Sequence, residues 1–274
     1  MIKNWLITGD CHGRVEGRLA SIKQNMPEYN PEETAVIILG DVGFNYYKSK
    51  HDWKTKQRAN KFGYTIYCLR GNHEDRAMNM KDDAEFTYDE NVNGTVLMEK
   101  EFPNIRYLSD KVAEYTINGL HVLTIPGAYS VDKWYRLQMD WHWFPEEQLT
   151  AEEMAEAEKY YSGTHYNLVL SHTCPIDWEP NDLFLRGIDQ SKVDKTMEVW
   201  LGKFKNMISW GVWLFGHYHA DRLERPYVEQ FYEEVEDLDS IMARWKKYSD
   251  TQELDWWLPK SPSFYMNVEG NSEK

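Results

Sequence analysis

The sequence of 274 residues has little cysteine and no long apolar run. Its three cysteines, Cys11, Cys68 and Cys174, are an odd number without CxxC spacing, so we expect a reducing compartment and no disulfide framework. No apolar stretch reaches the roughly 18 residues of a membrane-spanning helix, and the first residues, MIKNWLITGD, are too poor in apolar residues for a signal-peptide core. We therefore expect a cytoplasmic protein without a membrane segment.

Positive charge is also scarce. Lysine and arginine total 31 against 45 acidic residues, which gives a formal net charge of -14. A surface of this sign repels phosphate backbones, so non-specific nucleic-acid binding is not expected. The hydrophobic residues, 42% of the chain, suffice for a large core. The length favours a single domain over residues 1–274, with a C-terminal extension from about residue 225, and leaves the oligomeric state open.

Five short apolar runs that are typical of buried strands are each followed by a polar cluster. The runs span residues 5–8, 35–39, 64–69, 168–170 and 212–215. The clusters read TGDCHGR, LGDVGFN, LRGNHED, LSHTCP and FGHYH. Helices are predicted at residues 14–25, 48–62, 146–161 and 192–207. This alternation predicts an α/β fold in two similar halves, with the polar clusters at the carboxyl ends of the strands, where such sheets place their sites.

Antiparallel and C-terminal elements complete the predicted fold. Residues 114–124 hold an Asn118-Gly119 hairpin signal between apolar residues. Residues 228–235 are predicted as a strand and residues 238–245 as a helix, and residues 264–268 as a strand at a sheet edge. The last residues, 269–274, are expected to fray.

The polar clusters bring together residue types that bind transition metals. Asp10 and His12 are two positions apart, so both side chains point to the same side of an extended strand end. The full set of predicted ligands is Asp10, His12, Asp41, Asn72, His172, His217 and His219. Seven ligands exceed the usual set of one ion, whereas two ions share a bridging carboxylate, for which Asp41 is the natural choice. We expect two divalent ions: manganese first, with iron, zinc, cobalt, nickel or magnesium as alternatives.

In their order, these blocks resemble the signature of the calcineurin-like metallophosphoesterase superfamily, which is DxH, GDxx, GNHE, a later H and GHxH. Here the blocks read GDCHG, GDVGF, GNHED, SHTCP and GHYH, and they span residues 9–219. The resemblance implies a four-layer α-β-β-α sandwich, in which two mixed β-sheets pack face to face with helices outside. Residues 126–136, followed by 141–147, are similar to a block of bacterial and phage-type members.

The resemblance also implies roles for single residues. Asp10, His12, Asp41 and His219 would hold the first ion, and Asp41, Asn72, His172 and His217 the second. A metal-bridging hydroxide would then attack phosphorus. His73, which stays free of metal, would donate a proton to the leaving oxygen, with packing beside the ligands as the alternative.

Four residues are candidate contacts to the substrate: Arg136, Asn45, Arg70 and Arg76. Arg136 would clamp phosphate or pair with Asp132, and Asn45 would line the pocket or belong to a plain loop. Arg70 and Arg76 would balance phosphate or pair with Glu74 and Asp75. The other histidines, His51, His121, His142 and His165, lack ligand-rich neighbours and are expected at the surface or in the core.

The substrate class follows from a difference within the family. Protein serine/threonine phosphatases carry an Asp and an Arg in the GDxxDRG block, and this chain has Phe44 and Asn45 there. We therefore expect hydrolysis of a phosphomonoester or phosphodiester, with a nucleotide or small-molecule ester favoured. The alternatives are a protein phosphatase and a non-catalytic metal-binding scaffold.

Overall fold

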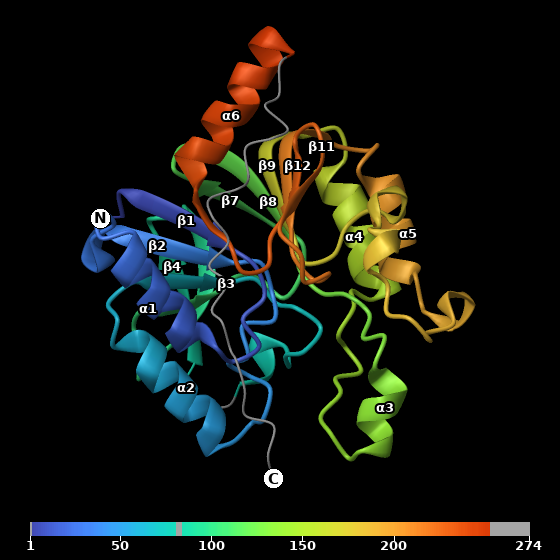
Figure 1. The fold of residues 1–274 in the computed structure, drawn as a ribbon, viewed down its shortest axis with the longest axis horizontal. Coiled ribbons are helices and arrows are strands. Elements are labelled where there is room, and N and C mark those ends of the chain that lie inside the picture. The colour runs from blue at the N-terminus through green and yellow to red at the C-terminus, as the bar shows by residue number, and fades with distance from the viewer. Residues whose placement is uncertain (1, 81–83, 253–274) are drawn as a thin grey trace.

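Two β-sheets packed face to face form the centre of the computed structural model, which describes residues 2–80 and 84–252 (Figure 1). The seven-stranded sheet runs in the order β13 (Val235–Asp237), β1 (Asn4–Thr8), β2 (Thr34–Ile38), β3 (Thr65–Cys68), β6 (Ile105–Tyr107), β5 (Gly94–Glu99) and β4 (Ala84–Asp89). The six-stranded sheet runs in the order β11 (Arg222–Arg225), β12 (Val228–Gln230), β10 (Ser209–Phe215), β9 (His165–Ser171), β8 (Leu120–Ile125) and β7 (Ala113–Ile117). Both sheets mix parallel and antiparallel pairs.

Helices cover the outer faces of the two sheets. Helices α1 (Val15–Asn25) and α2 (Lys50–Asn60) lie on one side of the molecule, and α4 (Ala151–Tyr161) and α5 (Thr196–Phe204) on the other (Figure 1). Three buried apolar clusters separate these layers: one between the sheets, one under α1 and α2, and one under α4 and α5. The four-layer sandwich expected from the sequence is therefore confirmed.

Parallel strands at the centre of each sheet position the polar clusters. β1, β2 and β3 are parallel neighbours in the first sheet, and β8, β9 and β10 are parallel neighbours in the second. All five residues of β2 are buried, because a central parallel strand has protein on both faces, which explains its unbroken apolar run. The carboxyl ends of these strands therefore bring the predicted ligands together.

The predicted strand at residues 228–235 was wrong, because this segment forms two strands in different sheets. β12 pairs with β10 in the six-stranded sheet, and β13 pairs with β1 in the seven-stranded sheet. Between them the carboxylate of Asp221 accepts backbone N–H groups of Tyr232, Glu233 and Glu234, which bends the chain from one sheet to the other. The predicted strand at 264–268 and the tail at 269–274 lie outside the described residues.

The helices differ from prediction mainly at their ends. α4 begins at Ala151 rather than near residue 146, because Thr150 and Glu153 form a reciprocal capping box there. The predicted helix at 238–245 is α6 (Leu238–Thr251), and a short helix, α3 (Lys133–Gln138), was not predicted. The 3-10 helices are Pro31–Glu33, Ala77–Asn79, Ile176–Trp178, Asn181–Leu183 and Gln190–Lys192.

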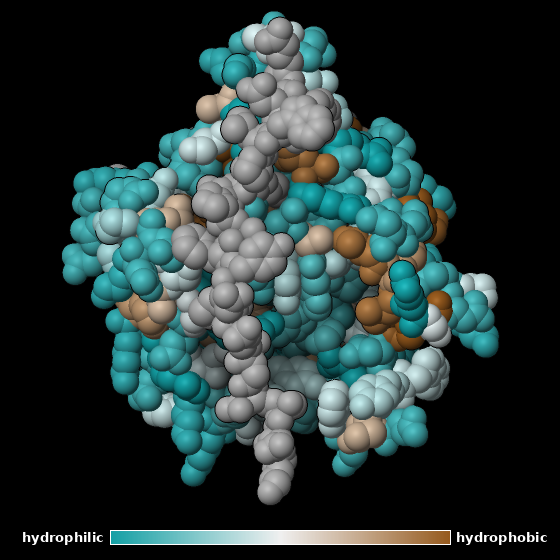
Figure 2. All heavy atoms as spheres, in the orientation of Figure 1, coloured by the Kyte–Doolittle hydropathy of each residue, from teal (hydrophilic) through white to brown (hydrophobic). Residues whose placement is uncertain are grey.

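The surface is mostly polar on the side that Figure 2 presents. The described residues on this face are largely hydrophilic, and the apolar ones gather in separate patches (Figure 2). Among the described helices, none combines the length and the apolar composition that crossing a membrane requires.

Candidate metal centre

The structure brings the seven predicted ligands together where the central strands of both sheets end. Asp10 and His12 follow β1, Asp41 follows β2, and Asn72 follows β3. The other three come from the six-stranded sheet: His172 follows β9, and His217 and His219 follow β10. Three overlapping groups of these side chains and His73 have ligand atoms within 4.8 Å of one another: Asp10 with His12 and His219, His12 with Asp41 and His73, and Asp10 with Asp41 and His172.

One end of the cluster is built on Asp10. The Nε2 atoms of His12 and His219 lie 2.9 Å apart. They are 3.8 and 3.4 Å from Oδ2 of Asp10. Asp10 is 1% exposed, and within the described part of the chain no hydrogen bond reaches this oxygen. A buried carboxylate oxygen without a donor is costly, and a cation held with two imidazoles would satisfy it.

The other end is built on His172. Its Nδ1 donates to the carbonyl oxygen of Leu39 at 2.7 Å, which leaves Nε2 facing the cluster. This Nε2 lies 2.9 Å from Oδ1 of Asn72 and 3.6 Å from Oδ2 of Asp41. The ring of His217 lies beside it, with the ring centroids 5.0 Å apart. Imidazole, amide and carboxylate groups thus converge at both ends of the site, and this donor set fits a pair of divalent transition metals.

The carboxylates of Asp41 and Asp10 give the site the negative charge that binding of a cation requires. Although burial opposes it, His73 and His172 hold the pKa of Asp41 well below its usual range. His219 and His172 likewise lower the pKa of Asp10 against the effect of burial. Burial works against a proton on His172, yet Asp41 and Asp10 raise its pKa to about 9. The two carboxylates therefore hold a positive charge at this position, and a metal ion would compete with that proton.

The backbone at four ligands has an unusual conformation. His12, Asp41, His217 and His219 have φ values of 45°, 46°, 72° and 53°. These left-handed values are uncommon outside glycine and are concentrated at functional sites, where the surrounding fold holds them. Each short turn after a strand thereby points its side chain back toward the other ligands.

Two glycines make room for the ligands. A Cβ atom on Gly40 would lie 2.0 Å from Nδ1 of His172, and one on Gly71 would lie 2.0 Å from Oδ1 of Asp41. Because neither contact is possible, the first glycine of LGDVG and the glycine of GNHED are required by the close approach of two loops.

His73 and Arg136 meet beside the cluster. The backbone N–H of His73 donates to Oδ1 of Asp41 at 2.8 Å, and its ring Nε2 lies 2.9 Å from Nη2 of Arg136. Burial lowers the pKa of His73 to about 4, and the Arg136 guanidinium acts in the same direction. Arg136 is the one buried residue of α3. It also pairs with Asp132 at 2.8 Å, which is the ion pair that the sequence left open for Arg136; its role as a phosphate clamp stays a prediction.

Arg70, Arg76 and Asn45 lie in other surroundings. Arg70 is buried against Asp110 at 3.3 Å and donates to the carbonyl oxygen of Glu147 at 2.8 Å. The guanidinium of Arg76 donates to the carboxylate of Glu153 at 2.8 Å. Asn45 is buried, and its backbone carbonyl oxygen accepts from the backbone N–H of Asp75 at 3.1 Å. The nearby acidic partners expected for these arginines, Glu74 and Asp75, are not the ones they use.

Two supporting residues were not predicted. The hydroxyl of Ser130 accepts from Nδ2 of Asn72 at 2.9 Å, which turns the amide oxygen toward His172. Glu74 is 5% exposed and accepts from the backbone of Gly43 at 2.5 Å and of Gly71 at 3.5 Å, so it joins the loops after β2 and β3. Burial raises the pKa of Glu74 to about 7. An acidic residue directly after the predicted ligand Asn72 and the predicted proton donor His73 was the available signal for Glu74, whereas nothing in the sequence singles out Ser130.

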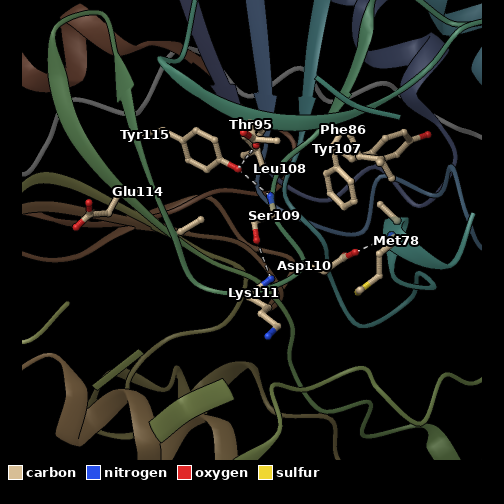
Figure 3. Close-up of a pocket in the computed structure, with 13 residues that line it drawn as sticks. Met78, Phe86, Thr95, Tyr107, Leu108, Ser109, Asp110, Lys111, Glu114 and Tyr115 are labelled. Carbon is tan, nitrogen blue, oxygen red and sulfur yellow. Dashed lines mark hydrogen bonds between the residues drawn. The ribbon is translucent and has the colours of Figure 1, made fainter. Parts of the chain in front are cut away.

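A separate cavity of about 380 Å³ lies at the edge of the molecule, between the β4–β5–β6 side of one sheet and β7 of the other (Figure 3). Its lining is mostly apolar and includes Leu97, Tyr107 and Tyr115. None of the predicted ligands lines it. The chemistry of the side chains, and not the size of a cavity, therefore locates the functional site.

The comparison with known families agrees with this site. The sequence profile of the calcineurin-like phosphoesterases matches residues 4–221, which include all seven ligands. The chain belongs to this family. It is therefore a metal-dependent phosphoesterase, of a family that uses a dinuclear metal centre.

Solved structures with a similar arrangement are distant in sequence. A protein from Thermus thermophilus is 11% identical, with a TM-score of 0.44, over 86% of this chain and 98% of its own. Phosphopantetheinyl hydrolase from Mycobacterium tuberculosis is 13% identical, with a TM-score of 0.41, over 92% of this chain and 94% of its own. No curated protein matches the chain significantly. The family assignment accordingly rests on the profile match and the ligand set.

Proposed function

We propose that this phosphoesterase binds two divalent ions through the seven predicted ligands and hydrolyses a small phosphomonoester or phosphodiester, with a nucleotide as a favoured substrate. The observation that carries the proposal is the convergence of two buried carboxylates, one amide and four imidazoles from five strand ends. When bound, the two ions would stabilise charge on the phosphoryl oxygens and supply an activated water as nucleophile. With no thiolate among the ligands, manganese is the first candidate.

Arg136 is the proposed phosphate-binding side chain. Its Nη2 lies 2.9 Å from the ring of His73, beside the carboxylate of Asp41. A guanidinium in this position would bind a phosphoryl oxygen and neutralise its charge. Arg136 also pairs with Asp132, but it is preferred to Arg70 and Arg76 because its guanidinium contacts His73, whereas theirs pair with Asp110 and Glu153. Asn45 stays a candidate for the wall of the substrate-binding site.

His73 is the proposed proton donor to the leaving oxygen. A phosphate placed between Arg136 and His73 would offset the repulsion between these groups and so raise the pKa of the imidazole from its low value. Its backbone bond to Asp41 fixes the residue next to the ligands without using the ring. The ring faces Arg136, so a phosphoryl group held by that guanidinium would meet the imidazole.

The alternative functions have less support. A protein phosphatase would be expected to carry the Asp and Arg that Phe44 and Asn45 replace. A non-catalytic scaffold would be expected to have lost a ligand or His73, and the chain keeps them all. The acidic surface also favours small substrates over nucleic acids.

Elemental analysis of protein saturated with Mn²⁺ and then freed of excess metal tests the proposal. We expect two ions per chain, and Asp41→Asn should lower metal content and turnover together. Glu152→Gln, an exposed carboxylate on α4, serves as the matched control and should change neither. One ion per chain in the wild type, or a wild type inactive on aryl phosphate monoesters, aryl phosphate diesters and cyclic nucleotides, would contradict the proposal.

A further inference from the structure

The segment that carries Arg136 to the metal centre has an unusual distribution of side chains. Arg136 is the single buried residue of α3, while Trp134 and Tyr135 are 69% and 53% exposed. After this helix the chain continues into a loop that contains His142 and Phe144. In Figure 1, α3 and its loops project from the body of the molecule as an arm. The arm therefore places a buried cation at the site and presents aromatic groups around it.

His142 is the aromatic side chain of this arm that combines exposure with a direct link to the site. His142 is an exposed residue, and the ring of the buried Phe144 lies parallel to its ring, at an interplanar angle of 5° and a centroid distance of 6.4 Å. The carbonyl oxygen of His142 accepts from Nη1 of Arg136 at 3.1 Å. The position of the ring is thus tied to the guanidinium that contacts His73.

Tyr46 forms a second wall at right angles to the first. Its ring meets those of His142 and Phe144 edge-on, at centroid distances of 5.7 and 6.3 Å. The Tyr46 hydroxyl lies 3.4 Å from Nη1 of Arg136, whose guanidinium carbon is 5.5 Å from the centre of the Tyr46 ring. Two perpendicular aromatic walls and a cation therefore share one corner beside the metal centre.

We propose that His142, supported by Phe144 and bordered by Tyr46, is a stacking site for a nucleobase, so that nucleoside phosphates are the preferred substrates. This proposal rests on the proposed function, because it assumes that Arg136 holds the phosphoryl group. A flat ring stacks on an exposed aromatic face whatever its hydrogen-bonding pattern, and such stacking is sequence-tolerant.

The spacing favours a nucleotide over an aryl phosphate. Nη2 of Arg136 contacts His73, whereas Nη1 contacts the Tyr46 hydroxyl and the carbonyl oxygen of His142, so the two nitrogens of one guanidinium face the two parts of the site. A nucleobase is separated from its 5′-phosphate by a ribose, whereas the ring of an aryl phosphate is attached directly to the ester oxygen. We therefore expect a ring that a sugar separates from phosphorus to reach the corner more easily than a ring attached directly to the ester oxygen.

Adenosine 5′-monophosphate and ribose 5-phosphate test the proposal, because they share the same ester and differ only in the base. With the manganese-loaded enzyme, kcat/KM for the nucleotide should exceed that for the sugar phosphate by about 5- to 150-fold, the range that base stacking supplies. His142→Ala removes the ring and keeps the backbone carbonyl that accepts from Arg136, so it should bring this ratio close to one. His142→Phe should restore the ratio.

Two further variants act as controls. Tyr46→Phe keeps the ring and should keep most of the selectivity, whereas Tyr46→Leu should reduce it. Trp134→Ala removes an exposed aromatic ring from the same arm and should leave the ratio unchanged.

Binding of adenosine, measured by calorimetry, separates this proposal from the proposed function. Adenosine has no phosphoryl group, and we expect it to bind the wild type and His142→Phe but not His142→Ala. Hydrolysis of both phosphates with equal kcat/KM would overturn the stacking site and leave the phosphoesterase assignment intact. Adenosine binding that requires His142, in a protein that hydrolyses no phosphoester, would support the stacking site and overturn the proposed function.

Discussion

Single side chains determine how the ligands face the metal centre, and Asn72 is the clearest case. An amide offers an oxygen that binds a cation and a nitrogen that does not. Because Ser130 accepts from the nitrogen at 2.9 Å, the oxygen faces His172. Ser130 is itself held by the carboxylate of Glu147, to which its backbone N–H donates at 3.1 Å.

Ser130→Ala should lower metal affinity at the His172 end by about 10- to 100-fold, the usual effect of removing a group that orients a ligand. Competition with a fluorescent chelator measures this affinity. Ser162→Ala, at an exposed position after α4, is the control and should bind metal like the wild type. Unchanged affinity in Ser130→Ala would mean that the amide keeps its orientation without the hydroxyl.

His73→Ala should keep both metal ions while lowering turnover, and the loss should be larger for alkyl esters than for activated aryl esters. The physical reason is that a poor leaving group needs a proton as the bond breaks, a contribution typically of about 10²- to 10⁴-fold. Steady-state rates for a series of esters with different leaving groups measure the effect. An equal loss for every ester would indicate that the ring positions the substrate instead.

At the scale of elements, α5 braces the turns that follow β9 and β10. Glu198 on α5 accepts the hydroxyl of Thr173 at 2.8 Å, and this hydroxyl lies 3.1 Å from that of Tyr218. Thr173 and Tyr218 are the chain neighbours of the ligands His172 and His217. A buried carboxylate is thereby placed behind the metal centre, where burial raises the pKa of Glu198 to about 7.

This raised pKa predicts a dependence of stability on pH. Between its usual value near 4.5 and about 7, the folded chain keeps a proton on Glu198 that the unfolded chain releases. The free energy of unfolding therefore falls as pH rises through this range. Glu198→Gln removes the effect, so its melting temperature relative to the wild type should be higher at pH 8 than at pH 4.5. Melting curves at the two pH values test this, with Glu152→Gln as the exposed control; a difference that does not change with pH would refute it.

At the scale of the whole molecule, the last described elements hold the two sheets together. β12 extends one sheet, β13 extends the other, and α6 then packs into the core between them. Trp245 on α6 is 1% exposed and belongs to that core. The prediction that residues from about 225 form an extension of a single domain stays a prediction, but these residues contribute strands to both sheets.

Trp245→Ala should therefore lower the free energy of unfolding by about 3–5 kcal/mol, the usual cost of truncating a large buried ring. Trp134→Ala makes the same substitution at an exposed position and should change it by less than about 0.5 kcal/mol. Urea unfolding followed by circular dichroism measures both. Similar losses in the two variants would contradict the packing of α6 described above.

The sequence alone determined the fold class and predicted the candidate ligands, because both depend on local patterns. An apolar strand buried on both faces requires a continuous run, and the polar residues directly after each run lie at the end of the strand. Parallel neighbours bring those ends together, so the strand ends that hold Asp10, Asp41, Asn72 and His172 were predictable to within a residue or two.

The tertiary structure alone decided which charged side chains lie beside the candidate ligands and which pair elsewhere. Arg70, Arg76 and Arg136 are the same residue type, and only the folded chain places the third beside His73 while the other two pair with Asp110 and Glu153. Arg136 and His73 are 63 positions apart in the chain. The partner of a long charged side chain depends on which elements pack around it, and that information is spread over the whole sequence rather than contained in any local motif.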